Sequence, residues 1–187
     1  MRPVETSHEL AGLVQGQFVA AETSDDSGQP LVVASLHAQT GDWPQEPFAA
    51  LSEEFRGALP EGRDVWQQDV MLAEARRAFD GRRFVAAGDL NIASRMDAIY
   101  DSSSPMWGSG LWFAQARDAG WMRCHLKFHA GEEQTFFRPG RQTEQMYQLD
   151  HFLADQVTYA AATRCDVLAI DGLEEMSDHA PMVMEFA

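Results

Sequence analysis

A predicted helix that leads into a short apolar strand constrains the fold of this chain more than any other feature. Apolar residues at helical spacing predict a helix from about Val65 to Phe79, and Gly81 is suited to end it. The β-rich run Phe84-Val85-Ala86-Ala87 follows and predicts a buried strand. Two compact polar residues, Asp89 and Asn91, come directly after it, so the end of the strand can present them to a ligand. This succession indicates an α/β fold.

The other predicted elements also mix strands with short helices, without internal repeats. Residues 13–22 and 31–36 are predicted to form a β-hairpin around a turn at 25–30, and its second strand runs into His37. Farther along we expect a serine-rich loop, a short helix, an extended piece and two more strands, at 101–110, 111–119, 135–137, 147–153 and 181–186. The class predicted from these elements is α/β (α+β).

Length and composition favour one globular domain. The chain has 187 residues, of which 45% are hydrophobic, so we expect residues 1–187 to form a single domain with a substantial core. No stretch is long and apolar enough to cross a bilayer, and the first residues lack the apolar region of a signal peptide, which favours a cytoplasmic location. Cys124 and Cys165 have no CxxC spacing and are expected to be reduced packing residues.

The charge balance limits what the chain can bind. A net charge of −15 disfavours tight, sequence-independent binding to nucleic acid, because such affinity depends on lysine and arginine displacing counterions. Lys127 is the only lysine, although arginines are adjacent at Arg76-Arg77 and Arg82-Arg83. A local basic patch therefore stays open as an interpretation, and so does a cation held by clustered carboxylates.

Three short motifs carry the chemistry. They are Gly88-Asp89-Leu90-Asn91, Leu149-Asp150-His151-Phe152-Leu153 and Ser177-Asp178-His179-Ala180-Pro181. The first motif alone is weak evidence, since Gly-Asp-x-Asn is also ordinary turn chemistry. The order of all three, with a strand ending in His37 upstream and Thr135-Phe136-Phe137 before the second, resembles the endonuclease/exonuclease/phosphatase superfamily of metal-dependent phosphoesterases.

The resemblance implies hydrolysis of a phosphate ester through a histidine base. His179 matches the family's general base, a role that suits imidazole because its pKa lies near the working pH. Asp150 matches the carboxylate that orients this histidine and stabilises the imidazolium. Asp89 and Asn91 match the pair that positions the attacking water and contacts the phosphate, and His37 matches a phosphate-contacting histidine.

The resemblance also implies a divalent metal ion and a particular architecture. Asp178 matches a residue beside the metal, which would be Mg²⁺ or Mn²⁺. The implied fold is a four-layer αββα sandwich with the active site at the seam. The family's first strand with its asparagine, and a later glutamate that binds magnesium, have no counterpart before Leu13, where Glu5 and Glu9 lie in no similar motif. We therefore expect an N-terminally truncated form of the family domain, with one sheet short and apolar surface exposed.

Three interpretations of activity follow. The chain could be a truncated phosphoesterase of weak activity, a fragment whose sheet and metal site are completed by a second copy or a partner chain, or a non-catalytic binding or regulatory module. The substrate could be DNA, RNA, a phosphoinositide or a phospholipid headgroup, because selectivity in the family lies in loops. Nuclease-like hydrolysis is the leading hypothesis, since the sequence has no membrane-seeking segment.

Some aromatic residues invite other interpretations. His125 and His129, four residues apart, could bind a metal, but the residues between them alternate as in a strand and no third ligand is evident nearby. His151 is expected to pack rather than to catalyse. Core packing is also a stronger interpretation than base stacking for the three tryptophans Trp107, Trp112 and Trp121.

Overall fold

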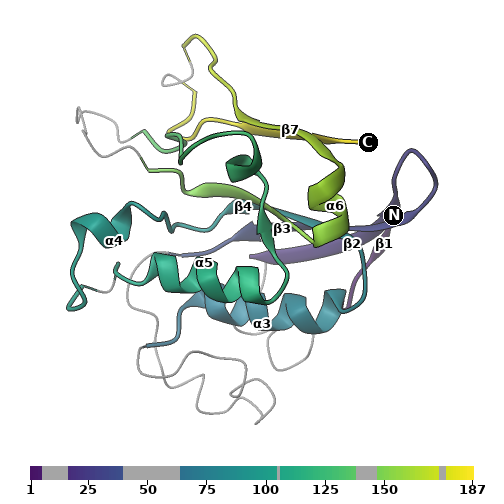
Figure 1. Ribbon diagram of the computed structural model, residues 1–187, viewed down its shortest axis with the longest axis horizontal. Coiled ribbons are helices and arrows are strands. Elements are labelled where there is room, and N and C mark those ends of the chain that lie inside the picture. Colours follow the sequence, from purple (N-terminus) through teal and green to yellow (C-terminus); the bar gives the residue numbers. More distant parts are fainter. Residues whose placement is uncertain (6–16, 40–63, 105, 138–146, 173–175) are drawn as a thin grey trace.

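The computed structural model shows two packed β-sheets with helices against the larger one (Figure 1). It describes residues 1–5, 17–39, 64–104, 106–137, 147–172 and 176–187. The larger sheet has six strands in the order β1-β2-β3-β4-β6-β5, and within the described residues only β3 and β4 pair in parallel. Its strands are β1 (Arg2–Pro3), β2 (Phe18–Ser24), β3 (Pro30–His37), β4 (Phe84–Asp89), β5 (Met122–Arg123) and β6 (Asp150–Ala154).

The second sheet and two helices cover opposite faces of the larger sheet. The antiparallel strands β7 (Ala162–Val167) and β8 (Met182–Phe186) lie over one face, and helices α3 (Gln67–Phe79) and α5 (Ser109–Asp118) cover the other (Figure 1). The shorter elements are α4 (Met96–Ile99), the 3-10 helix η2 (His125–Lys127) and α6 (Gln156–Ala161). Among the described residues, no helix has the length and apolar character needed to span a membrane.

Alternation along the strands decides which layer each side chain meets. In β3, Val32, Ala34 and Leu36 are buried in the cluster formed with the helices. Phe79 of α3 joins the same cluster and packs on Phe84 of β4, with ring centroids 5.3 Å apart. Residues at the intervening positions of β3, such as the exposed Val33 and Ser35, point to the opposite face of the sheet, where polar side chains can stay accessible to a ligand.

The predicted helices and the strands of the hairpin, before Asp89 and at the end of the chain occur in the predicted order with shifted boundaries, whereas α6 and β7 were not predicted. Helix α3 begins at Gln67 and β4 continues through Asp89. The predicted hairpin is present as β2 and β3, but β2 runs on to Ser24 because its pairing with β3 extends to the turn. The first residues of that predicted strand, 13–16, lie outside the described residues. Helix α5 begins at Ser109, within the segment predicted as a loop.

Three local predictions were wrong. The strand predicted at 147–153 begins only at Asp150, because its pairing with β4 starts there, opposite Asp89, the last residue of β4. The strand predicted from the alternation after His125 is absent, since this segment forms the 3-10 helix η2. The backbone N–H of His129 donates to the His125 carbonyl oxygen at 3.1 Å. The expectation that these two histidines lack a third ligand is wrong as well, because the carboxylate of Glu133 lies beside them.

Candidate active site

The ends of three neighbouring strands place three of the predicted residues in one row. The register pairs His37 of β3 with Asp89 of β4, and Asp89 with Asp150 of β6. Directly paired residues on adjacent strands point to the same face of a sheet. That face meets the smaller sheet, because Phe152, on the same face of β6 as Asp150, packs in a cluster with Met182 of β8. The row therefore lies at the seam between the sheets.

Gly88 lets β3 and β4 come close enough to form this row. Its φ is +145°, and a Cβ at this position would lie 1.8 Å from the carbonyl oxygen of Leu36. Any other residue would push β3 and β4 apart, so the packing of the strands themselves requires this glycine. The first residue of the Gly-Asp-x-Asn motif thus serves the fold directly, and through the fold it places the end of β3 beside Asp89.

Asn91 closes a tight polar turn after β4. Its φ is +53°, a left-handed conformation that asparagine tolerates better than most residues. Its backbone N–H donates to Asp89 Oδ1 at 2.7 Å, and its side-chain amide donates to Asp89 Oδ2 and to the Ala38 carbonyl oxygen, both at 2.8 Å. The motif is therefore a turn and a strand end at once, and these bonds hold the Asp89 carboxylate in one orientation.

His179 approaches the row from the segment that precedes β8. Its Nδ1 lies 2.8 Å from Asp150 Oδ2, and its Nε2 lies 4.0 Å from Asp89 Oδ2. A carboxylate can only accept a hydrogen bond, so the proton of the neutral imidazole is on Nδ1 and Nε2 keeps its lone pair. The imidazole is held at one nitrogen and can take up a proton at the other.

Backbone pairing with the predicted extended piece keeps this histidine in place. An isolated bridge joins Phe136 to His179, and the Phe136 ring lies 5.2 Å from the imidazole. On either side, the Phe137 N–H donates to the Asp178 carbonyl oxygen and the Ala180 N–H donates to that of Thr135, each at 2.7 Å. The exposed side chain of Asp178 is thereby held next to the imidazole.

The charges around His179 favour its protonated form. Burial alone would lower the pKa of His179, but the hydrogen bond and charge of Asp150, with smaller contributions from Asp89 and Asp178, raise it above its ordinary value. Burial raises the pKa of Asp89, the Asn91 N–H opposes that rise, and the negative charge of Asp150 adds to it. A site with several carboxylates around one imidazole stabilises an imidazolium formed during proton transfer and attracts a cation.

A pocket of about 460 Å³ opens beside the imidazole. Its lining includes both His179 and Asp150 and takes its other walls from β4, β6 and the start of β8, including Gly88, Phe152 and Met182. The pocket therefore lies along the seam between the two sheets, on the face that carries the row of polar side chains.

Two polar residues that support the site were missed as site residues at the sequence level. The buried hydroxyl of Thr135 accepts hydrogen bonds from the backbone N–H groups of Leu149 and Asp150, at 2.9 and 3.1 Å, and so sets where β6 begins. Ser177 Oγ accepts from the backbone N–H of His179 at 3.0 Å. Its position two residues before the histidine is a recognisable turn signal, whereas the sequence around Thr135 contains no comparable one.

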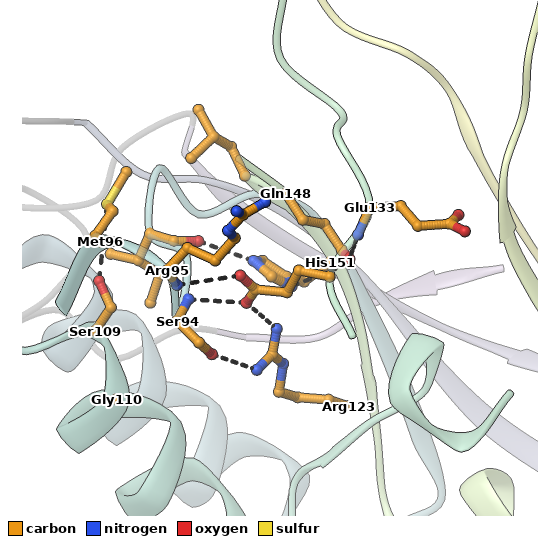
Figure 2. Close-up of polar contacts among 12 residues, drawn as sticks. Ser94, Arg95, Met96, Ser109, Gly110, Arg123, Glu133, Gln148 and His151 are labelled. Atoms are coloured by element: carbon orange, nitrogen blue, oxygen red, sulfur yellow. Dashed lines mark hydrogen bonds and ion pairs between the residues drawn. The ribbon is translucent and has the colours of Figure 1, made fainter. Parts of the chain in front are cut away.

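A buried ion pair anchors the loop that follows β4 (Figure 2). The carboxylate of Glu132 accepts hydrogen bonds from the backbone N–H groups of Ser94 and Arg95, at 2.8 and 3.3 Å. The same carboxylate pairs with the guanidinium of Arg123, which also donates to Ser94 Oγ at 2.8 Å. This network ties the loop after the Asp89 turn to strand β5.

The remaining aromatic and thiol residues behave as packing residues. Trp112 and Trp121 are buried in the core, and His151 is buried with its Nε2 2.9 Å from the Ile92 carbonyl oxygen. Burial also raises the pKa of each of the two thiols to about 12, as expected of packing cysteines, at Cys124 and Cys165.

No family model and no curated protein matches this sequence. Solved structures match it in fold. A 3′ phosphatase, NExo, from Neisseria bound to a product DNA hairpin shares 21% identity over 99% of this chain and 71% of its own, with a TM-score of 0.69. An AP endonuclease from Archaeoglobus fulgidus shares 16% identity over 99% of this chain and 71% of its own, with a TM-score of 0.66. An endonuclease/exonuclease/phosphatase family protein from Leptotrichia buccalis shares 13% identity over 91% of this chain and 53% of its own, with a TM-score of 0.56. The chain has the fold of the endonuclease/exonuclease/phosphatase superfamily.

This finding confirms the α/β sandwich fold that the resemblance implies. The chain spans between 53% and 71% of the length of these three structures. Because a fold can host many chemistries, the superfamily fold does not by itself assign a reaction.

Proposed function

We propose that this chain hydrolyses phosphate esters, with His179 as the general base that removes a proton from the attacking water. The observation that carries the proposal is the 2.8 Å contact between His179 Nδ1 and Asp150, with Asp89 4.0 Å from the other ring nitrogen. Because Nδ1 is held by Asp150, Nε2 is the atom that takes the proton. Asp150 then stabilises the imidazolium and keeps the ring in its orientation.

The other residues of the row position the reacting groups. The side-chain amide of Asn91 donates to the Asp89 carboxylate and to the carbonyl oxygen of Ala38, which follows β3. In this way Asn91 orients the Asp89 carboxylate toward the water. His37, exposed at the end of β3 and paired in register with Asp89, supplies a hydrogen-bond donor to a phosphoryl oxygen. Fixed donors of this kind stabilise the charge that develops on the phosphoryl group.

A divalent cation, Mg²⁺ or Mn²⁺, is the cofactor we propose. Mg²⁺ prefers oxygen ligands and commonly binds through one or two carboxylates together with substrate phosphates. Asp89 and Asp178, whose charges both act on His179, are the two carboxylates that we propose for this role. Over the described ranges of the chain no three acidic or histidine ligand atoms converge at this site, so the substrate phosphate would be an essential ligand. When bound, the cation supplies positive charge beside the phosphoryl oxygens.

Nucleic acid is the substrate class we propose. Two of the structurally similar proteins are a 3′ phosphatase bound to a DNA hairpin and an AP endonuclease. The net charge of −15 favours contact with a single phosphate at a strand end or a lesion over wide contact with the backbone. Phosphoinositides and phospholipid headgroups are the competing substrates. A cytoplasmic location and a single domain over residues 1–187 stay predictions.

Hydrolysis assays with the purified chain test the proposal. Duplex oligonucleotides that carry a 3′-phosphate or an abasic site are incubated with Mg²⁺ or Mn²⁺, in parallel with a soluble phosphoinositide. We expect the DNA to be hydrolysed, and the rate to fall at least about 100-fold in His179→Ala. The control is Asp118→Asn, which removes the charge of an aspartate whose side chain is 74% exposed and which is not part of the site. This variant should keep the full rate.

The outcomes separate the competing interpretations. Hydrolysis of the phosphoinositide without hydrolysis of DNA would contradict the substrate class, and an unchanged rate in His179→Ala would contradict the assignment of the base. A rate per chain that rises with protein concentration would indicate that a second copy completes the site. Binding of DNA without hydrolysis of any substrate would indicate a binding or regulatory module and would contradict the enzymatic proposal.

A further inference from the structure

A second cluster of ligating side chains uses none of the residues of the candidate active site. His125, His129 and Glu133 each offer one ligand atom, and the three atoms all lie within 4.8 Å of one another. The two imidazole rings are nearly parallel, with centroids 4.1 Å apart and an interplanar angle of 7°. Glu133 Oε1 lies 3.5 Å from His129 Nδ1, and Glu133 Oε2 lies 3.9 Å from His125 Nε2.

The local fold explains why these residues meet. Helix η2 and the hydrogen bond from the His129 N–H to the His125 carbonyl oxygen form one helical turn, which brings side chains four residues apart onto the same side. The backbone N–H of Glu133 donates to Gln148 Oε1 at 3.1 Å. Figure 2 shows the carboxylate of Glu133 pointing away from the network around Arg123 and Ser94. The neighbouring Glu132 serves that network, so Glu133 is the acidic residue available to the histidines.

In each imidazole, the ring nitrogen that points away from Glu133, called the outer nitrogen, makes a hydrogen bond to a residue of β7. His125 Nδ1 lies 3.1 Å from the Cys165 carbonyl oxygen, and His129 Nε2 lies 2.9 Å from Asp166 Oδ1. Both partners are acceptors, so the ring protons of the neutral imidazoles are on these outer nitrogens. The inner nitrogens, His125 Nε2 and His129 Nδ1, keep their lone pairs and face the Glu133 carboxylate. Carboxylate and backbone oxygens hold metal-binding histidines in this way in many proteins.

The inner nitrogen of His125 is a buried polar atom without a partner. The side chain of His125 is 2% exposed, and its Nε2 has no hydrogen-bond partner. Buried polar atoms are nearly always satisfied, so an unsatisfied one that points at other ligating atoms indicates a bound species.

We propose that His125 Nε2, His129 Nδ1 and Glu133 bind a zinc ion. Two imidazole nitrogens with one carboxylate suit Zn²⁺ and not Mg²⁺, which prefers oxygen ligands. Three protein ligands leave a fourth position for water. The Glu133 carboxylate offsets part of the charge of the divalent ion, and Asp166, which also pairs with Arg164 at 2.6 Å, holds His129 from behind. The bound ion would fasten the segment from η2 to Glu133, which includes the Glu132 ion pair, onto β7 through Asp166 and the Cys165 carbonyl oxygen.

Zinc binding to the purified chain tests this proposal independently of any hydrolytic activity. Zn²⁺ is titrated by calorimetry in the presence of excess Mg²⁺, which occupies oxygen-only sites. We expect one Zn²⁺ per chain, with affinity falling at least about 10-fold in His129→Gln, in Glu133→Gln and in Asp166→Asn, since loss of an outer-shell carboxylate alone commonly costs about 10- to 100-fold. Glu5→Gln, the same change at an exposed glutamate, should bind as wild type does.

A second readout and a further variant make the result specific. Co²⁺ added in place of Zn²⁺ should give the visible absorption of a four-coordinate ion, and the band should be lost in His129→Gln. Asp178→Ala, at the candidate active site, should leave Zn²⁺ affinity unchanged. The proposal is overturned if wild type binds no Zn²⁺, if affinity is unchanged in both His129→Gln and Glu133→Gln, or if it is lost in Asp178→Ala.

Discussion

A neutral histidine buried beneath the candidate site should make the fold sensitive to mild acid. His151 is buried, its Nε2–H donates to the Ile92 carbonyl oxygen at 2.9 Å, and its ring packs 5.0 Å from that of Phe113. Burial, with a contribution from the positive charge of Arg123, lowers the pKa of His151 to about 3. In the unfolded chain the same group has a pKa of about 6.5.

The sign and size of the effect follow from this difference. Below the unfolded pKa the unfolded chain binds a proton that the folded chain excludes, so stability is fully present above about pH 6.5 and is lost as pH falls toward about 3. The loss approaches about 1.4 kcal/mol per pH unit, which gives about 2 kcal/mol between pH 7 and pH 5. Few carboxylates titrate in that interval, so the contribution of His151 is best measured there.

Urea denaturation at a series of pH values measures this loss. In His151→Gln, whose amide can still donate to the Ile92 carbonyl oxygen, the free energy of unfolding should fall by about 2 kcal/mol less between pH 7 and pH 5 than in wild type. His37→Asn, which removes an exposed imidazole, is the matched control. An NMR titration of wild type should show His151 neutral down to about pH 4. An identical pH dependence in His151→Gln and wild type, or a His151 resonance that titrates near pH 6.5, would refute this reasoning.

Three further predictions follow from the site and its supports. Gly88→Ala should lower the free energy of unfolding by about 3 kcal/mol or more, because its Cβ would meet the Leu36 carbonyl oxygen, whereas Gly131→Ala, with open space around it, should cost far less in the same denaturation assay. Glu132→Gln should cost about 3 kcal/mol in urea denaturation, since it leaves the Arg123 guanidinium buried without its charge partner. Asp150→Asn should move the acidic limb of the pH–rate profile to lower pH while reducing the plateau, because the loss of its charge and hydrogen bond lowers the pKa of His179; an unmoved limb would contradict this coupling.

Local chemistry made part of the site predictable from sequence. The strand before Asp89, the turn at Asn91 and the strand that ends in His37 depend on neighbouring residues, and all three are present. The pairing of Asp150 with His179 joins residues 29 apart and depends on strand register, which local patterns do not determine. It could be expected only from the resemblance of ordered motifs to a known family.

The errors have identifiable physical causes. The segment after His125 alternates in polarity as a strand does, but its backbone forms the 3-10 helix η2. Glu133, which follows this helix in the sequence, lies beside the two histidines, and the polarity pattern gave no sign of this contact. Helix α6 is too short for periodicity to reveal it. Asp155, which accepts hydrogen bonds from the Val157 and Thr158 N–H groups, was nevertheless a usable N-cap signal in the sequence.

The central claim is that His179 and Asp150 act as one unit in phosphate ester hydrolysis, and a double-mutant cycle tests it most directly. Rates of DNA hydrolysis are compared for wild type, His179→Ala, Asp150→Asn and the double variant, with folding checked by thermal denaturation. The account predicts that the double variant is no slower than His179→Ala alone, because a residue that orients the base has no effect once the base is gone. Losses that multiply in the double variant, as for independent residues, would contradict it.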